Sequence, residues 1–250
     1  MNRQSPLGIV VIMFITFTML LYANLGLANS NLHTPFNRVL EGNVINGQVD
    51  YSAIKLHPEF KPYIDSLKAK PTFNNQNEEL TYWINAYNAL VIKGILEGGS
   101  PSTFFGRNSF FKGDQYQLAD MFINLNDLER KVIIPIGEPR IHFAINCASS
   151  SCPKLRPQVF TADELDTQLE HAANEFINDT SRNKFDSERK IARISKIFDW
   201  FEEDFVKHSG SVQKYLSQYV NNSEIAEHLR NEEYKIKYLK YDWSLNGTKP

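Results

Sequence analysis

Two cysteines that stand five positions apart, Cys147 and Cys152, are the residues of this chain best suited to covalent chemistry. A cysteine acts as a nucleophile when a nearby cation, an imidazole or the start of a helix lowers the pKa of its thiol. Arg140 and His142 precede Cys147 closely, and the serines at 149–151 can present backbone N–H groups to its sulfur. Cys147 is therefore the best candidate for a catalytic nucleophile, with His142 as its base or as the group that orients it.

The segment that carries these residues limits this hypothesis. Residues 141–145 are apolar except for His142 and predict a short buried strand. A straight strand would place His142 and Cys147 roughly 16 Å apart and on opposite faces, so they can meet only if the chain folds back after Ile145. Three alternatives stay open: His142 is a core histidine satisfied by a hydrogen bond, Cys147 is an inert buried thiol, or Cys147 and Cys152 form a disulfide.

Polar residues in apolar surroundings supply the candidate substrate contacts. Asn85 and Asn88 share one face of an otherwise apolar helix, so their amides either bond buried backbone or face a cleft. They are candidates for contacts to a substrate or an oxyanion, or else structural ties to a neighbouring loop. Asn146, on the same side of the presumed strand as His142, and Arg140, whose planar fork suits a carboxylate, complete the predicted substrate contacts.

The acidic residues and the spacing of cysteines and histidines give no strong indication of a further catalytic group or a metal site. Asp127 and Glu129 could orient His142 or Arg140, although acidic residues at the start of a helix are ordinarily just favourable dipole partners. The cysteines and histidines lack the matched spacing of a four-ligand zinc site. We therefore predict neither a metal site nor another cofactor.

Helices and short strands must hold these residues in place. The clearest helix is predicted over residues 78–96, where apolar residues recur at steps of three and four, and Gly98-Gly99 ends it. The other expected elements are a turn at Asn46-Gly47, an aromatic loop and a strand near 115–118, a short helix capped by Asn124 or Asn126, a helix over 162–177 opened by a capping box of Thr161 and Glu164, a strand over 190–194, a helix over 197–206 and a strand near 234–241. Together they predict one α+β domain over residues 29–250, with helices packed on a small, mostly antiparallel sheet.

The first 28 residues are typical of an export signal. Arg3 provides the positive start, residues 7–22 carry no charge, and Gly26-Leu27-Ala28 suits a cleavage site. The apolar run is short for a transmembrane helix, so we expect cleavage before Asn29, no stable membrane span afterwards and a periplasmic or secreted protein; an uncleaved anchor is the alternative. The formal net charge of -2 excludes the basic surface that nucleic acid binding needs.

Four motifs occur in a fixed order along the chain. They are residues 82–90 (YWINAYNAL), 125–129 (LNDLE), 139–149 with Ser151-Cys152-Pro153, and 195–200 with Glu203-Asp204-Phe205. Over about residues 36–219 this pattern resembles domain of unknown function family 547, which is found in bacteria and plants and has no established reaction. The resemblance implies a fold similar to the papain and transglutaminase-like group, in which a cysteine at a helix start meets a histidine on a strand.

This chain departs from both patterns. Thr81, Tyr82 or Trp83 stands where the papain-like group has its helix-start cysteine, and Arg130 stands where the family's acidic motif commonly continues with histidine. Either Cys147 supplies the thiol from another place, or the scaffold has kept the fold without that chemistry.

Two hypotheses of function follow. The first is an exported thiol-dependent hydrolase or acyl transferase that acts on an amide or a small peptide-like thiol compound. The second is a non-catalytic module for a ligand or partner, with a Cys147–Cys152 disulfide and a pocket lined by Trp83, Tyr87 and Phe110. A thiol-disulfide carrier is less favoured, because four residues instead of two separate the cysteines. The sequence specifies neither the substrate nor the oligomeric state.

Overall fold

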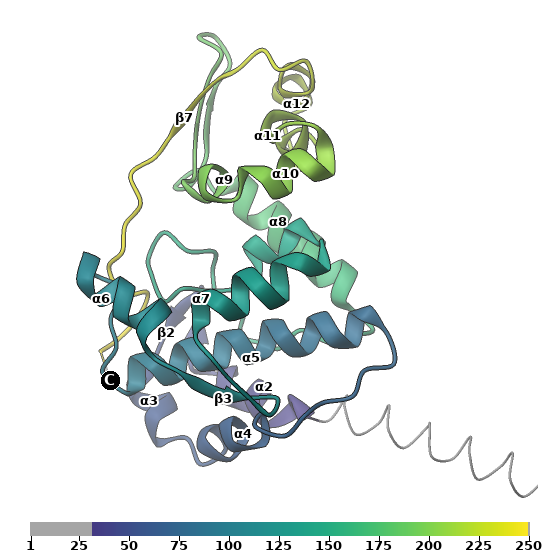
Figure 1. Ribbon diagram of the computed structural model, residues 1–250. Coiled ribbons are helices and arrows are strands. Elements are labelled where there is room, and N and C mark those ends of the chain that lie inside the picture. The colour runs from purple at the N-terminus through teal and green to yellow at the C-terminus, as the bar shows by residue number, and fades with distance from the viewer. Residues whose placement is uncertain (1–31, 250) are drawn as a thin grey trace, which may run out of the picture.

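The computed structural model describes residues 32–249, so the predicted signal over residues 1–28 lies outside it. Helices and three small sheets make up this part of the chain (Figure 1). The α-helices are α2 (Thr34–Leu40), α3 (Tyr51–Leu56), α4 (Phe60–Ser66), α5 (Gln76–Leu96), α6 (Phe104–Asn108), α7 (Leu125–Asp127), α8 (Leu165–Asn178), α9 (Ile197–Trp200), α10 (Glu202–Ser209), α11 (Val212–Leu216) and α12 (Ser223–Arg230). The π-helical turns are η1 (Ser109–Gly113) and η2 (Leu128–Ile133), and the 3-10 turns are η3 (Ile134–Ile136) and η4 (Pro139–Phe143).

The strands pair in small sheets. They are β1 (Val44–Ile45) with β2 (Gln48–Val49), β3 (Tyr116–Leu118) with β4 (Met121–Ile123), and β5 (Lys184–Asp186), β6 (Ile191–Ile194) and β7 (Lys235–Tyr238) in one sheet. The β6–β7 pair is parallel and the other described pairs are antiparallel. The predicted α+β fold with a mostly antiparallel sheet is therefore confirmed.

Helix α5 forms the centre of the lower lobe in Figure 1. Its side chains are buried from Leu80 to Ile95 on almost every face, as expected of a helix that is apolar all round. Asn75 caps its first turn by accepting the N–H of Glu78. Helix α3 and the turn η2 both pack on α5. The predicted helix over residues 78–96 is confirmed and begins two residues earlier.

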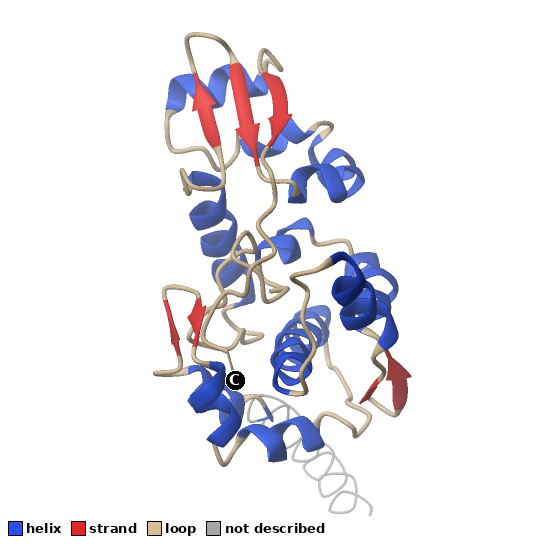
Figure 2. Cartoon of the chain, turned by 90° about the vertical axis from the view of Figure 1, so that its left-hand side faces the viewer, coloured by secondary structure: helices blue, strands red, loops and turns tan. Residues whose placement is uncertain are grey.

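The upper lobe holds the sheet β5–β6–β7 and the helices α9 to α12 (Figure 2). Two apolar clusters fill the two lobes, and η4 and α8 contribute to both clusters. Ile141 and Leu169 belong to the lower cluster, whereas Phe143 and Phe176 belong to the upper one. Helix α8 thus links the two lobes. Within residues 32–249, no helix is long and apolar enough to span a membrane.

The predicted strand over residues 141–145 is wrong. The chain forms the 3-10 turn η4 there, which starts at Pro139 and is capped by the carboxylate of Glu138, an acceptor for the N–H of Arg140. A short buried apolar run fits a strand and a helical turn equally well, and here no neighbouring strand supplies a ladder. The chain consequently turns after Phe143, so the 16 Å separation expected of a straight strand does not apply.

The predicted capping box before α8 is also wrong. Helix α8 begins at Leu165 with Glu164 as its cap residue, and no side chain caps it. The backbone N–H of Thr161 instead donates to the side chain of Gln168. The contact from Gln168 fixes the entry to the helix in place of the predicted pair.

A C-terminal strap, residues 239–249, runs from β7 back to the lower lobe along one side of the molecule (Figure 1). On its way it pairs with the loop that carries the cysteines: the N–H of Ser150 donates to the carbonyl of Ser244 at 2.8 Å. Near its end Gly247 lies so close to β2 that a Cβ atom there would stand 1.9 Å from the carbonyl oxygen of Val49. Only glycine fits this crossing, and the strap ties both lobes to the cysteine loop.

Candidate functional site

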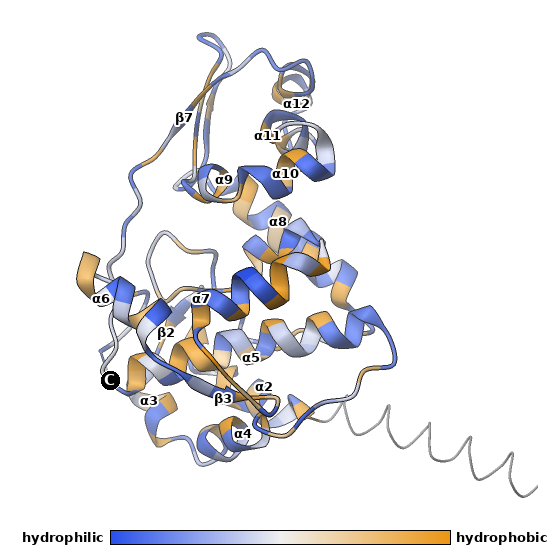
Figure 3. Ribbon diagram, in the orientation of Figure 1, coloured by the Kyte–Doolittle hydropathy of each residue, from blue (hydrophilic) through white to orange (hydrophobic). Residues whose placement is uncertain are grey.

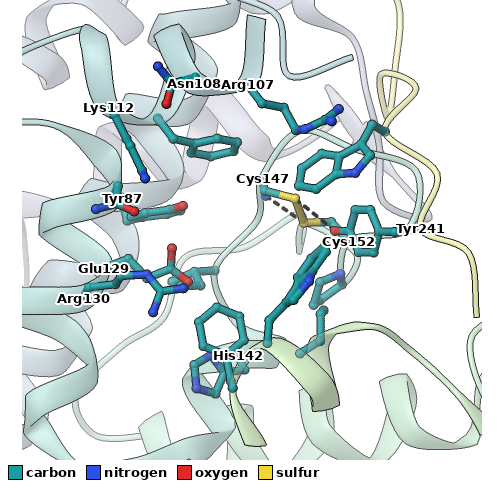
Figure 4. Close-up of a pocket in the computed structure, with 18 of the residues that line it drawn as sticks. Tyr87, Arg107, Asn108, Lys112, Glu129, Arg130, His142, Cys147, Cys152 and Tyr241 are labelled. Carbon is teal, nitrogen blue, oxygen red and sulfur yellow. Dashed lines mark hydrogen bonds between the residues drawn. A yellow bond between two sulfur atoms is a disulfide. The ribbon is translucent and has the colours of Figure 1, made fainter. Parts of the chain in front are cut away.

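An open pocket of about 470 Å³ lies where the two lobes, the cysteine loop and the strap meet. Figure 4 shows Tyr87, Glu129 and Arg130 on one side of it, with Cys147, Cys152 and Tyr241 opposite. The lining residues are Tyr87, Phe104, Arg107, Asn108, Phe111, Lys112, Asn126, Glu129, Arg130, His142, Ile145, Cys147, Cys152, Pro153, Ile197, Trp200, Phe201, Tyr241 and Trp243. Its volume is in the range of sites for small organic ligands.

Aromatic rings form much of the wall. Trp200 and Phe201 come from the end of α9, and Tyr241 and Trp243 come from the strap. The ring centroids of Trp200 and Tyr241 are 4.7 Å apart, and those of Tyr241 and Trp243 are 4.5 Å apart. Trp200 is 38% exposed, so it is a wall residue and not part of the core. The walls therefore offer flat apolar surfaces to a ligand.

Three cationic side chains line the same pocket: Arg107 after the start of α6, Lys112 on η1 and Arg130 on η2. None of the three forms an ion pair with a carboxylate of residues 32–249. The guanidinium of Arg107 lies 4.6 Å from the ring centroid of Trp243, and that of Arg130 lies 5.4 Å from the ring of Phe201. These cation–π contacts hold positive charge against the aromatic walls.

Glu129 on η2 is the acidic residue that lines the pocket. Burial and the negative charge of Asp204 raise the pKa of Glu129 to about 7, although the positive charge of Arg130 acts in the opposite direction. The side chain is half-buried. Near neutral pH this carboxyl is therefore only partly charged, and it can take up or release a proton there.

The two cysteines are joined in a disulfide at the pocket wall. Cys147 is half-buried, whereas Cys152 is 4% exposed. The sulfur of Cys147 lies 3.1 Å from the hydroxyl of Ser149 and 3.1 Å from that of Tyr241. The sulfur of Cys152 accepts the backbone N–H of Cys147 at 2.9 Å. The sulfurs thus stand in a defined polar setting within reach of the pocket.

His142 also lines the pocket but is bound to a different partner. Its Nε2 lies 2.8 Å from a carboxylate oxygen of Asp204, and its ring stacks on Phe201 with centroids 4.0 Å apart. Its Nδ1 has no hydrogen-bond partner in the described part of the chain. Burial lowers the pKa of His142, although Asp204 acts against this effect. The structure places His142 and Cys147 around one pocket without a hydrogen bond between them.

The asparagines predicted as substrate contacts bond backbone groups. The amide of Asn85 pairs with the N–H and the carbonyl of Phe160, at 3.0 and 2.9 Å. Asn88 donates to the carbonyl of Ala144 and accepts the N–H of Asn146. These two bonds fix the turn after η4 to α5. Neither Asn85 nor Asn88 lines the pocket.

The side chain of Asn146 closes the cysteine loop. Its amide nitrogen donates to the carbonyl of Pro153 at 2.7 Å, and its oxygen accepts the N–H of Ala148 at 2.7 Å. Asn246 of the strap donates to the same oxygen. Asn146 therefore shapes the loop around Cys147 and Cys152 from inside.

Arg140 lies away from the pocket, among carboxylates of η4 and α8. It makes a two-pronged ion pair with Glu138, at 2.9 and 2.7 Å, and also contacts Asp166 and Glu170. The guanidinium is thus engaged within the protein and joins the two elements that link the lobes.

Several pocket residues carry no signal in the sequence. In the sequence, Trp200 and Phe201 form an aromatic stripe with Phe198 and Phe205 that is typical of a helix face packed in the core. The strap residues Tyr241 and Trp243 belong to no recognisable motif. The hypothesised pocket of Trp83, Tyr87 and Phe110 is right for Tyr87 alone. Phe110 is buried against glycines of the lower lobe, and its neighbour Phe111 faces the pocket instead. The long aromatic loop was the one signal that pointed to a lining segment.

Comparison with protein-family models matches residues 71–177 to the family described as "Protein of unknown function, DUF547". This segment contains α5, Glu129, His142 and both cysteines. No curated protein and no solved structure matches the chain, so the similarity to the papain and transglutaminase-like group stays a prediction. The resemblance inferred from the motifs is confirmed by this match: residues 71–177 fit the DUF547 family model.

Proposed function

We propose that the pocket binds a small organic anion with a flat apolar body, and that the protein does so outside the cytoplasm, in the periplasm or as a secreted protein. The observation that carries the proposal is that Arg107, Lys112 and Arg130 line the pocket without an ion pair to a carboxylate of residues 32–249. The two guanidinium groups lie against aromatic rings of the wall. The location rests on the export signal predicted from the sequence of the first 28 residues.

The charge balance of the pocket differs from that of the whole chain. The chain has a formal net charge of -2, yet three cations line the pocket against one carboxyl group, Glu129, whose pKa of about 7 leaves it partly neutral. Charge gathered in a hollow surface raises the local concentration of the opposite charge. An anion is therefore favoured over a neutral or cationic ligand of the same shape.

The walls determine the shape of the ligand. Trp200, Phe201 and Trp243 present ring surfaces, and Arg107 and Arg130 lie over two of these rings. A flat apolar body can stack on the rings while its acidic group meets a guanidinium, which binds carboxylate, sulfonate or phosphate groups through paired hydrogen bonds. The combination favours an aromatic or planar acid.

The geometry favours binding over catalysis by a Cys147–His142 pair. The sulfur of Cys147 is bonded to Cys152, and the Nε2 of His142 is engaged by Asp204. A thiol-dependent hydrolase or acyl transferase would need both contacts to open before His142 could activate the thiol. That enzyme stays a prediction, whereas the binding site requires no rearrangement.

The test is calorimetric titration of the full chain with 2-naphthalenesulfonate and with the neutral 2-naphthalenemethanol. We expect saturable binding of the sulfonate at one site and weaker binding of the alcohol. The double variant Arg107→Gln/Lys112→Gln should weaken sulfonate binding by about 1 to 2 kcal/mol, roughly 5- to 30-fold, because each exposed charge pair contributes up to about 1 kcal/mol. Binding of the alcohol should change by less than about twofold.

A matched control separates the local charges from the net charge. Lys55 and Lys184 are exposed, lie outside the pocket and make no ion pair with another described residue. Lys55→Gln/Lys184→Gln changes the net charge by the same amount and should leave sulfonate affinity unchanged. Equal affinity for the sulfonate and the alcohol, or equal losses in both double variants, would show that the pocket does not select anions.

A further inference from the structure

We propose that the Cys147–Cys152 disulfide is a thiol-exchange site, at which a small anionic thiol held in the pocket attacks the sulfur of Cys147. The inference rests on the proposed anion-binding function and adds a covalent reaction and a ligand class to it. The chemistry needs three things: an accessible sulfur, a stabilised leaving thiolate and a means to hold the incoming thiol. The described residues provide each of them.

The two sulfurs differ in accessibility. Cys147 is half-buried on the pocket wall, while Cys152 is 4% exposed. In Figure 4 the disulfide lies beside Tyr241, on the wall opposite Glu129 and Arg130. A thiolate that enters the pocket therefore meets Cys147 first. Because the attacked sulfur is the one that keeps the ligand, the mixed disulfide should form on Cys147.

The leaving sulfur already has a hydrogen-bond donor. The backbone N–H of Cys147 points at the sulfur of Cys152 at 2.9 Å. When the bond breaks, negative charge develops on this sulfur, and a hydrogen bond from an N–H group stabilises a thiolate more than a neutral sulfur. The better the leaving thiolate is stabilised, the faster exchange proceeds. This contact therefore favours attack on Cys147 over attack on Cys152.

The step balances without another reagent. The thiolate of the ligand forms a new S–S bond to Cys147, the Cys147–Cys152 bond breaks, and its electron pair leaves on Cys152. The proton that the ligand lost on ionising has gone to solvent. Return attack by the Cys152 thiolate on Cys147 expels the ligand and restores the disulfide. The reaction is thus reversible, and the small thiol is the only co-reactant.

The surrounding contacts keep the loop in place while the bond is open. The N–H groups of Ser150 and Ser151 donate to strap carbonyls at 2.8 and 3.1 Å, and Asn146 spans the loop to Pro153. These bonds do not involve the S–S bond. The Cys152 thiolate should therefore remain close to Cys147, which favours reclosure.

A chain of contacts connects the anion site to the reactive sulfur. Arg107 lies 4.6 Å from the ring of Trp243, whose centroid is 4.5 Å from that of Tyr241. The hydroxyl of Tyr241 lies 3.1 Å from the sulfur of Cys147. An acid bound by Arg107 along this wall consequently has a short reach to Cys147. Small thiols that carry an acidic group are the ligands this arrangement selects.

The test compares three thiols of similar size and different charge: 2-mercaptoethanesulfonate, 2-mercaptoethanol and cysteamine. Each is mixed with the oxidised full chain, the reaction is stopped with N-ethylmaleimide, and mass spectrometry locates the products. The rate on the folded protein is divided by the rate on the same chain unfolded in urea, which removes the intrinsic reactivity of each thiol. We expect this ratio to be about tenfold or more larger for the sulfonate than for 2-mercaptoethanol, and smallest for cysteamine.

The site of reaction and the charge variants complete the test. The thiol adduct should be on Cys147 and the maleimide on Cys152. Arg107→Gln/Lys112→Gln should reduce the sulfonate ratio to within about twofold of the neutral ratio, while Lys55→Gln/Lys184→Gln should not reduce it. An adduct on Cys152, free thiols in the isolated protein, or exchange only after unfolding would overturn the proposal.

The outcomes distinguish this proposal from the binding function. If 2-naphthalenesulfonate binds in the calorimeter but the disulfide does not exchange, only the thiol-exchange proposal fails. If the naphthalenesulfonate does not bind and exchange is independent of thiol charge, the anion-binding function fails as well.

Discussion

Replacing Glu129 by glutamine should abolish the pH dependence of anion binding. In the wild-type protein, burial and Asp204 raise the pKa of Glu129 to about 7. Below that pH the carboxyl is neutral and does not oppose an anion, and above it a negative charge lines the pocket. The affinity for 2-naphthalenesulfonate should therefore fall as the pH rises from 6 to 8. Burial lowers the pKa of His142, so the titration of this residue is displaced towards lower pH, away from that of Glu129.

The size of the effect follows from Coulomb's law. An anion about 6 Å from the carboxylate is repelled by about 3 kcal/mol at an effective dielectric of about 20, and by about 1 kcal/mol at about 60. A single group with a pKa of about 7 can change the dissociation constant by at most about tenfold between pH 6 and pH 8, so these repulsions should raise it roughly 4- to 10-fold. In Glu129→Gln it should vary by less than about twofold, at a value near that of the wild type at pH 6.

Protein stability provides a second readout of the same group. An acid whose pKa is higher in the folded than in the unfolded state stabilises the fold at low pH, and this stability is lost as the pH rises from about 4.5 to about 7. At about 1.4 kcal/mol per pH unit, the loss amounts to at most about 3.5 kcal/mol. Urea unfolding at pH 5 and pH 8 should show Glu129→Gln gaining stability relative to the wild type as the pH rises.

The assays are calorimetric titration with 2-naphthalenesulfonate at pH 6, 7 and 8 and urea unfolding monitored by circular dichroism, for both proteins. A wild-type affinity that stays constant from pH 6 to 8 would refute the placement of a titrating Glu129 beside the bound anion. The same pH dependence in wild type and Glu129→Gln would refute the assignment to this residue.

Three further substitutions test the structural roles of residues outside the pocket. Asn85→Ala should lower the free energy of unfolding by about 2 to 4 kcal/mol, because both backbone groups of Phe160 lose their partner. Loss of naphthalenesulfonate affinity at unchanged stability would instead indicate that Asn85 contacts the ligand. Arg140→Gln should lower the free energy of unfolding by about 1 to 3 kcal/mol at pH 7. Burial would raise the pKa of Glu138 but the bonds from Arg140 lower it, so the cost of the substitution should shrink as the pH falls and Glu138 becomes protonated. An equal loss of stability in urea unfolding at pH 3 and pH 7 would contradict this pairing. Gly247→Ala should lower the free energy of urea unfolding by about 2 to 3 kcal/mol, because its Cβ would stand 1.9 Å from the carbonyl oxygen of Val49. The control is Gly113→Ala, whose Cβ would meet only a serine side chain at 3.3 Å or more. Equal stability of the two variants would disprove the close crossing.

The long elements of the fold could be predicted from the sequence because their pattern is redundant. Helix α5 shows many apolar positions at helical spacing and a glycine stop, so a few exceptions do not obscure it. The hairpin of β1 and β2 follows from Asn46-Gly47, both of which have positive φ as this turn requires. The five residues of η4 offer no such redundancy, because a short buried run has no measurable period.

The candidate site could be predicted only where its residues lie close together in sequence. His142, Cys147 and Cys152 were expected around one centre, and they do line one pocket. By contrast, Tyr241, whose hydroxyl contacts the sulfur of Cys147, lies 94 residues later in the sequence, on the C-terminal strap. Such long-range contacts depend on the path of the whole chain. Trp200 could not be separated from a core residue, since its neighbours on the same stripe are buried.

The most direct test of the anion-binding function is a crystal structure of the full chain soaked with 6-bromo-2-naphthalenesulfonate. Anomalous scattering from the bromine locates the ring system independently of the surrounding density. We expect the ring between Trp200, Phe201 and Trp243, with the sulfonate bonded to Arg107, Lys112 or Arg130. A bromine peak only outside this pocket, or a sulfonate that avoids all three cations, would contradict the proposed function.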